Sequence, residues 1–248
     1  MYDFSGKIAV VTGAAQGLGE AIAKRFLNDG IPGVALLDLN EEVLAATAAR
    51  LDPEGNRVMP VACDVSDPDS VAQAFQAVER RFGTVDILVN NAGISAREPL
   101  ADYTPEAFRR IMDLNVTAVF HGCKAVEPVM RAAGHGCIIN TSSMVSLYGQ
   151  PSGVGYPTSK FAVNGLTRSL ARELGPAGIR VNAVAPGVTR TDMVAALPPE
   201  LVERISAPIP LRRIGEAEEV ANVFLFLASE LASYVTGAVI SVDGAAQT

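Results

Sequence analysis

Residues 7–26 have the sequence KIAVVTGAAQGLGEAIAKRF. A short apolar run ends in a glycine-rich turn, and an amphipathic helical pattern follows it, which is the order strand, turn, helix. Gly13, Gly17 and Gly19 let the backbone turn tightly and leave room for a close neighbour. The start of a helix offers unpaired N–H groups and the positive end of the helix dipole. We therefore predict that this turn binds a pyrophosphate.

The glycine spacing is GxxxGxG and differs from the usual GxGxxG, so an ordinary strand-to-helix turn is the competing interpretation. The next apolar run favours a dinucleotide, because it ends in Asp38, nineteen residues after Gly19. A carboxylate there accepts hydrogen bonds from both hydroxyls of an adenosine ribose and repels a 2′-phosphate. NAD is therefore expected rather than NADP. Asn40 is better placed than Asp38 to cap the following helix.

Short apolar runs alternate with amphipathic stretches along the whole chain. This alternation predicts βαβ units and a parallel sheet with helices on both faces. We expect strands to start at Lys7, Gly33, Arg57, Asp86, Cys137, Arg180 and Ala238. The predicted fold class is α/β, a Rossmann-type doubly wound parallel sheet of about seven strands in one domain over residues 1–248. Residues 187–210 form a long insertion, expected to be a partly helical substrate flap.

Composition disfavours several kinds of partner. A formal net charge of −7 and a pI of about 4.9 give no field that would draw the chain to nucleic acid or to an anionic membrane. No apolar run reaches the ~18 residues that cross a bilayer, and no signal-like segment opens the chain, so a cytoplasmic location is expected. No metal site is expected either. We interpret Cys63, Cys123 and Cys137 as reduced, mostly buried packing residues. His121 is interpreted as a packing residue, and His135 as a solvated loop residue.

Polar residues follow two further strands. Asp64 comes after the third strand, and NNAG places Asn91 and Gly93 after the fourth. Each segment alone is compatible with a simple turn. Because the carboxyl ends of parallel strands meet at one edge, where open α/β sheets bind their ligands, three such strand ends favour a cofactor groove.

The stretch GYPTSK, residues 155–160, places Tyr156 four residues before Lys160. Residues four apart lie one above the other on a helix, so the ammonium can approach the phenol. Pro157 suits the first helical position, which would put Tyr156 at the helix entrance. Both the ammonium and the helix dipole favour a phenolate, so a lowered tyrosine pKa is predicted, as proton exchange with an alcohol near neutral pH requires. The alternative is two residues that only share a helix face.

The fifth strand ends in Ser142 and Ser143, where a hydroxyl can donate to a carbonyl oxygen that gains negative charge. A turn of small polar residues is the other interpretation. Together the motifs resemble the short-chain dehydrogenase/reductase family over essentially the full chain. TGAAQGLG matches its TGxxxGxG, NNAG recurs, YPTSK matches YxxxK, MDLNV contains Asn115, and APG follows the sixth strand.

The resemblance implies a role for each residue of a catalytic set. Tyr156 is the general acid/base, and Lys160 lowers its pKa and holds the nicotinamide ribose. Ser143 orients the substrate oxygen, and Asn115 holds a water that passes the proton to solvent. An NAD site is expected from Gly13, Gln16, Gly17, Leu18, Gly19, Asp38, Asp64, Val65, Asn91, Ala92, Gly93, Tyr156, Lys160, Pro186, Gly187, Val188 and Thr191.

Segments such as SGVGYPTSK and VAPGVTRTDM are similar to bacterial hydroxysteroid dehydrogenases and, less closely, to 3-oxoacyl thioester reductases. A hydrophobic or amphipathic alcohol is therefore expected, and a polyol or small hydroxy acid is the alternative. Arg97 and Arg190 are either solvated or meet a substrate carboxylate or sulfonate. The predicted substrate residues are Ser95, Arg97, Ser143, Val145, Gln150, Tyr156 and Met193.

Three alternative functions would require different sequence features. A non-catalytic nucleotide sensor has no need of a proton donor such as Tyr156. A sugar-nucleotide epimerase would be longer and have a different glycine spacing, and a purely structural oligomer has no use for Asp38 at a ribose position. The resemblance also implies a homotetramer with residues 105–126 and 159–174 between subunits, although the same apolar stripes suit a core.

Overall fold

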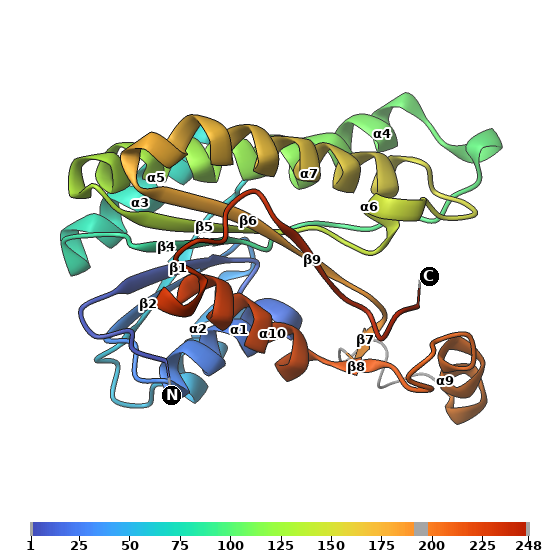
Figure 1. The fold of residues 1–248 in the computed structure, drawn as a ribbon, viewed down its shortest axis with the longest axis horizontal. Helices are drawn as coiled ribbons and strands as arrows, with labels where there is room; N and C mark the ends of the chain where they lie inside the picture. Colours follow the sequence, from blue (N-terminus) through green and yellow to red (C-terminus); the bar gives the residue numbers. More distant parts are fainter. Residues whose placement is uncertain (1, 191–197, 247–248) are drawn as a thin grey trace.

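The computed structural model describes residues 2–190 and 198–246 (Figure 1). At its centre is a seven-stranded parallel sheet in the order β3-β2-β1-β4-β5-β6-β9, which confirms the predicted fold class. The described strands of this sheet are β1 (Ile8–Thr12), β2 (Gly33–Asp38), β3 (Val58–Ala62), β4 (Ile87–Asn90), β5 (Gly136–Thr141), β6 (Ile179–Pro186) and β9 (Val239–Val242). Each of them overlaps one of the predicted apolar runs.

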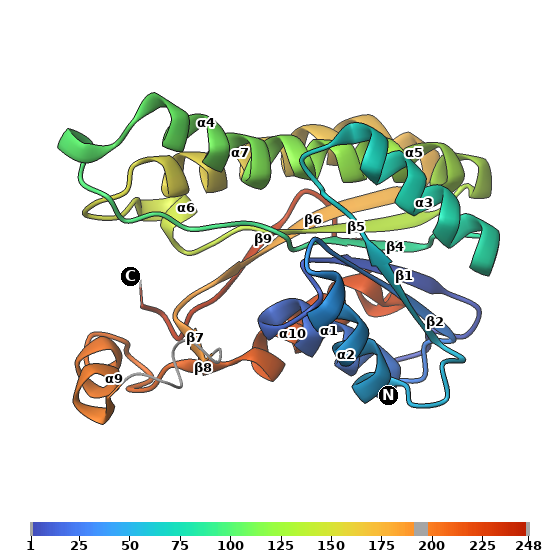
Figure 2. The ribbon, with the colours of Figure 1, turned by 180° about the vertical axis from the view of Figure 1, so that it is seen from behind.

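Helices cover both faces of the sheet, and Figures 1 and 2 show the two layers from opposite sides. One layer contains α1 (Gly17–Asn28), α2 (Glu41–Leu51) and α10 (Ala217–Ala228). The other contains α3 (Pro68–Phe82), α5 (Ala118–Ala133) and α7 (Gly155–Leu174). None of the described helices is long and apolar enough to cross a membrane.

Strand β1 shows why the apolar runs are nearly continuous. All five of its residues are buried. Successive side chains of a strand point to opposite faces. Ala9 and Val11 pack into the layer of α1 and α10, while Ile8 and Val10 pack into the layer of α3 and α5. Because both faces are covered, neither needs polar residues.

The sheet order reverses at β1, which pairs with β2 on one side and β4 on the other. Such a switch point opens a crevice at the carboxyl ends of the strands. The shorter elements at this end are α4 (Pro105–Met112), α6 (Val145–Tyr148), β7 (Thr189–Arg190), α9 (Pro199–Ser206) and β8 (Gly215–Glu216). β7 pairs with β8 in a separate two-stranded ladder.

Local capping explains several helix boundaries. Asn40 caps α2 as predicted, because its Oδ1 accepts the Val43 N–H at 3.1 Å. α7, however, begins at Gly155, so Pro157 is its third residue and the prediction of the first helical position was wrong. Proline is tolerated there because the N–H groups of a first helical turn have no intrahelical acceptor. Tyr156 still lies in that first turn.

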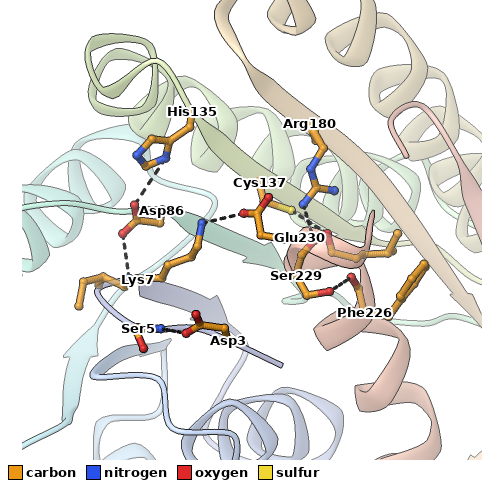
Figure 3. A network of polar contacts seen from close by, with 12 residues as sticks. Asp3, Ser5, Lys7, Asp86, His135, Cys137, Arg180, Phe226, Ser229 and Glu230 are labelled. Atoms are coloured by element: carbon orange, nitrogen blue, oxygen red, sulfur yellow. Dashed lines mark hydrogen bonds and ion pairs between the residues drawn. The ribbon is translucent and has the colours of Figure 1, made fainter. Parts of the chain in front are cut away.

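Polar contacts close the opposite, amino edge of the sheet (Figure 3). The buried Asp86 carboxylate accepts the Ile8 N–H at 2.8 Å and lies 3.7 Å from Nδ1 of the exposed His135. Lys7 Nζ lies 3.2 Å from Glu230 Oε1. These groups pair with one another or with the backbone, so they stabilise the strand ends.

The three cysteines are free and buried, as predicted. Burial raises the pKa of the Cys123 thiol to about 12 and that of Cys137 to about 11. Burial also raises the pKa of Cys63. Because the thiolate is the reactive form, these side chains are inert packing residues at neutral pH.

Candidate active site

The glycine-rich turn after β1 is locked against the turn after β4. Asn91 Nδ2 donates to the carbonyl oxygens of Thr12 and Gly13, both at 3.1 Å. In the other direction, Thr12 Oγ1 accepts the N–H groups of Asn91 and Ala92, both at 3.0 Å. The two predicted cofactor segments, 78 to 80 residues apart in the chain, therefore form one rigid wall.

This wall has no room for side chains at two of its glycines. A Cβ at Gly13 would lie 2.8 Å from Ala92 Cα, and a Cβ at Gly19 would lie 2.2 Å from the Gly13 carbonyl oxygen. Gly13 and Gly17 both have a φ of +63°, which L side chains rarely adopt. In the part of the chain that the structure describes, the N-cap residue Gln16 makes no side-chain hydrogen bond to α1. The bare backbone and the start of α1 therefore fit a pyrophosphate.

Asp38 ends β2 beside the same turn. Its Oδ2 accepts the Ala15 N–H at 3.1 Å, and its Oδ1 accepts the Asn40 N–H at 3.0 Å. An ionised carboxylate has about four acceptor sites, so two such bonds leave capacity for ribose hydroxyls. Two backbone N–H groups thus fix the carboxylate beside the glycine-rich turn, and its contact with a ribose stays a prediction.

Asp64 and Val65 follow β3 at the same edge. Asp64 Oδ1 accepts the N–H and the hydroxyl of Ser66, at 2.9 and 2.6 Å. The Val65 carbonyl lies 3.1 Å from Nδ1 of His121, a partly buried side chain. These contacts order the loop, and the predicted contacts of Asp64 and Val65 with the cofactor stay predictions.

A cavity of about 370 Å³ opens where these segments meet. It brings together residues from the ends of β4, β5 and β6 and from the first turns of α1 and α7. It is lined by Leu18, Asn91, Gly93, Ile94, Ser95, Thr141, Ser142, Ser143, Tyr156, Lys160, Pro186, Gly187 and Thr189. Val188, next along the chain from Gly187, holds β8 through its carbonyl, which accepts the Gly215 N–H at 3.0 Å. The predicted residues Thr191 and Met193 lie outside the described part of the chain.

Tyr156 and Lys160 both line this cavity, but the pKa of Tyr156 shifts in the direction opposite to the predicted one. Lys160 Nζ lies 5.8 Å from the centroid of the Tyr156 ring and donates to the Thr141 carbonyl at 2.8 Å. Burial raises the pKa of Tyr156, while a hydrogen bond with Ser143 and the charge of Arg97 act in the opposite direction. The prediction of a lowered Tyr156 pKa was therefore wrong for this structure, because loss of water around the phenol outweighs the nearby charge.

Burial also lowers the pKa of Lys160, to about 8. Its side chain is 5% exposed and ends among the strand termini that line the cavity. A buried ammonium with one carbonyl partner retains two N–H groups to donate. Lys160 can therefore bind hydroxyl groups of a ligand without losing the contact with Thr141.

Asn115 lies under the floor of the site, in a short π-helix over Asp113–Thr117 that separates α4 from α5. It is fully buried. Its Oδ1 accepts the Ile94 N–H at 2.8 Å, and its Nδ2 donates to the Ile94 carbonyl at 2.8 Å and to Ser159 Oγ at 3.0 Å. The side chain thus ties the loop after β4 to the first turns of α7. Its predicted role in a proton relay stays a prediction.

The chain is similar to proteins of known family over almost its full length. A protein-family model described as enoyl-(acyl carrier protein) reductase matches residues 13–246. The chain is 53% identical over 245 residues to a 3alpha-hydroxysteroid dehydrogenase of Mediterraneibacter gnavus, which covers 98% of this chain and 97% of the relative. The chain belongs to the short-chain dehydrogenase/reductase family. It is therefore an oxidoreductase, and the family uses a nicotinamide cofactor.

Two further relatives extend the comparison. A 3-oxoacyl-[acyl-carrier-protein] reductase of Thermotoga maritima is 39% identical over 239 residues, which are 96% of this chain and 97% of the relative. The crystal structure of an NAD⁺-bound xylitol dehydrogenase superposes with a TM-score of 0.91 at 35% identity, covering 98% of this chain and 99% of the other. Each of these three relatives thus matches at least 96% of this short-chain dehydrogenase/reductase.

Two of the predicted substrate residues have structural contacts. Gln150 Nε2 donates to the carbonyls of Ala96 and Gly153, at 3.1 and 2.9 Å. Val145 is buried at the start of α6, and its N–H approaches Ser143 Oγ at 3.4 Å. Both residues hold the loops that shape the cavity, and neither lines it.

Sequence reasoning missed several residues that build the site of this short-chain dehydrogenase/reductase. Thr12 joins the two turns, Thr141 holds Lys160, and Ser159 joins Asn115 to α7 through a 2.7 Å bond from its hydroxyl to the Tyr156 carbonyl. Asn164 accepts the Ser142 hydroxyl at 2.7 Å. The one available signal was position, since Thr12 and Thr141 each end a strand beside a predicted motif.

Proposed function

We propose that this short-chain dehydrogenase/reductase interconverts a secondary alcohol and a ketone with NAD, using Tyr156 as the general acid/base. The observation that carries the proposal is the cavity that holds Ser143, Tyr156 and Lys160 next to the glycine-rich turn. A cofactor seated with its pyrophosphate on that turn would supply the hydride acceptor at this cavity. Neither a sensor nor a structural protein has a use for this combination.

The proposed work of the chain is to position groups and to move one proton. Ser143, buried beside the phenol, donates to the substrate oxygen and holds it near Tyr156. Tyr156 removes the hydroxyl proton during alcohol oxidation and returns it during ketone reduction. The hydrogen bond with Ser143 and the positive charge of Arg97 favour the phenolate, which partly offsets the effect of burial on the pKa of Tyr156. Asn115 and Lys160 would pass the proton on to solvent, as the family resemblance implies.

The choice of NAD rests on Asp38. Its carboxylate is fixed by two backbone N–H groups next to the turn. A 2′-phosphate at this point would meet a like charge. Similarity to a protein described as NAD⁺-bound supports the same choice.

Replacing Asp38 by alanine is expected to shrink the preference for NAD over NADP by about tenfold to a hundredfold, since a charged hydrogen-bonding partner is lost. The measurement is kcat/KM for both cofactors with one alcohol. Asp38→Asn is the matched variant, because it keeps an acceptor for the Ala15 N–H and removes only the charge. An unchanged cofactor ratio in both variants would remove Asp38 from the ribose site.

We propose a hydrophobic or amphipathic substrate such as a hydroxysteroid or a bile acid. The support is the 53% identity to a relative named for a 3α-hydroxysteroid. The alternative is reduction of a 3-oxoacyl thioester, which the 39% identical reductase favours. A polyol is a further alternative, favoured by the similarity to xylitol dehydrogenase.

The test is a panel assay of reduced-nicotinamide absorbance with purified protein. Hydroxysteroids, 3-hydroxyacyl thioesters, polyols and small secondary alcohols are offered with NAD and with NADP. Fastest turnover of a hydroxysteroid with NAD is the expected result. Faster turnover of a thioester or a polyol would replace the proposed substrate class, and binding of NAD without any turnover would favour the sensor.

Three expectations about the assembled protein belong to the same proposal. The chain is expected to act as one domain with a substrate flap at residues 187–210, of which residues 191–197 lie outside the described part of the chain. In the described part of this segment, α9 lies at the carboxyl end of the sheet (Figure 1). A homotetramer is supported by Phe120 on α5 and Phe161 on α7, which are each 50% exposed and suit a partner surface. The cytoplasmic location expected from the sequence stays a prediction.

A further inference from the structure

The loop after β4 carries Arg97 to the rim of the cavity. Ser95, two residues earlier, lines the cavity together with Tyr156. The Arg97 side chain is itself exposed. Arg97 is therefore an exposed residue that follows the cavity lining closely along the chain, although it does not itself line the cavity.

Contacts with the segment before α7 fix the backbone of this loop. Gln150 Nε2 donates to the Ala96 carbonyl, and the Gly153 N–H donates to the Glu98 carbonyl at 2.9 Å. A Cβ at Gly153 would lie 2.7 Å from Arg97 Cα, so this close approach requires a glycine. Because Gly153 precedes Tyr156 by three residues, the origin of the Arg97 side chain is held next to the helix start that carries the phenol.

The charge of Arg97 acts on the reacting centre. It lowers the pKa of Tyr156, after the larger effects of burial and of the Ser143 hydrogen bond. A Coulomb interaction weakens with distance and is screened by water. This effect on Tyr156 agrees with the close approach of the Arg97 backbone to the segment that starts the helix of the phenol.

No carboxylate in the described part of the chain forms an ion pair with Arg97. The neighbouring Glu98 carboxylate accepts the backbone N–H of Arg97 at 3.0 Å instead. Arg190, the other arginine considered as an anion site, differs in this respect, since its Nε lies 3.0 Å from Glu216 Oε1. Arg97 is thus the better placed of the two to bind an acid group from outside the protein.

We propose that Arg97 binds an acidic group of the substrate and thereby selects amphipathic secondary alcohols that carry a carboxylate or a sulfonate. The inference rests on the proposed function, because it takes the alcohol to react at Tyr156. A guanidinium binds such groups through two parallel N–H···O bonds. A substrate with its alcohol in the cavity and its acid at the rim would satisfy Tyr156 and Arg97 together.

The experiment compares Arg97→Gln with the unmodified enzyme on two matched substrates, a hydroxysteroid carboxylic acid and its methyl ester. The quantity measured is the ratio of kcat/KM for the acid to kcat/KM for the ester. This ratio cancels any effect of Arg97 on Tyr156 that the two substrates share. We expect it to fall about tenfold to a hundredfold, mainly through KM for the acid, because a hydrogen-bonded charge pair is lost in the bound complex.

Two further variants separate recognition of the acid group by the guanidinium from a general effect of positive charge on the protein. Arg97→Lys keeps the charge and loses the planar fork, so a smaller fall in the ratio is expected. Arg80→Gln makes the same charge change at an exposed position in the last turn of α3, and its ratio should equal that of the unmodified enzyme. An unchanged ratio in Arg97→Gln, or an equal fall in Arg80→Gln, would overturn the proposal.

A pH profile with the neutral ester supplies a second readout. Loss of a positive charge near Tyr156 should move the rise in ester oxidation to higher pH, which a purely structural loop residue would not do. If the unmodified enzyme oxidises acid and ester equally well, the proposed function stands and the role of Arg97 falls. If neither substrate nor any alcohol of the panel is oxidised, both fall together.

Discussion

Tyr156→Phe is expected to lower kcat for alcohol oxidation about a hundredfold to ten-thousandfold, the usual contribution of a positioned general acid/base. The variant keeps the aromatic ring of residue 156 and loses only the hydroxyl that exchanges the proton. Cofactor binding should remain, because Lys160 and the glycine-rich turn are unchanged. Stopped-flow or steady-state absorbance of reduced nicotinamide gives kcat, and calorimetry gives the affinity for NAD.

The control for this prediction is Tyr234→Phe. Tyr234 is fully exposed and does not line the cavity. The control substitution therefore removes a phenol hydroxyl away from the reacting centre. This control should retain full activity. Equal kcat in Tyr156→Phe and the unmodified enzyme would refute the mechanism.

The pH dependence follows from the same residue. Alcohol oxidation needs the phenolate, so its rate should rise as pH increases through the pKa of Tyr156, while ketone reduction needs the phenol and should fall over the same range. Because burial raises that pKa, oxidation should be favoured on the alkaline side of neutrality. The pH dependence of both reactions should disappear in Tyr156→Phe.

Gly19→Ala is expected to weaken NAD binding by more than about a hundredfold and to destabilise the fold by about 1–3 kcal/mol, as overpacked sites do. The added Cβ would lie 2.2 Å from the Gly13 carbonyl oxygen and 2.8 Å from Asn91 Nδ2. The first of these atoms belongs to the backbone and cannot move without shifting the turn. The second is the amide that joins this turn to the one after β4.

Gly175→Ala is the matched control for the turn. Gly175 has a φ of −52°, and a Cβ there would meet no heavy atom within 4 Å in the described structure. Thermal unfolding and NAD calorimetry on both variants separate a loss of stability from a loss of binding. A folded Gly19→Ala protein with the NAD affinity of the unmodified enzyme would show that the turn does not hold the cofactor.

The sequence was informative where one local signal determines the structure. Strands buried on both faces appear as continuous apolar runs, and β1 is buried at every residue. The spacing of Tyr156 and Lys160 on one helix placed both in the same cavity. Gly83 ends α3 in the left-handed conformation, as the predicted helix stop required.

Other features depend on contacts between distant segments, which a single sequence does not encode locally. The bonds from Thr12 to the turn at Asn91 cross 79 positions, and Asn115 reaches Ile94 and Ser159 on two other segments. The pKa of Tyr156 depends on burial by the assembled fold. The position of Lys160 four residues after Tyr156 suggested a lowered pKa for the phenol instead. The sequence does not show that the ammonium donates to the Thr141 carbonyl.

In the proposed reaction, a hydride leaves the carbinol carbon of a secondary alcohol for the nicotinamide of NAD. The most direct measurement uses the best alcohol of the panel with deuterium at that carbon, followed by mass spectrometry and NMR of the reduced cofactor. We expect one deuterium on the nicotinamide ring, placed on a single face. A reduced cofactor without deuterium, or no reduced cofactor from any alcohol of the panel, would contradict it.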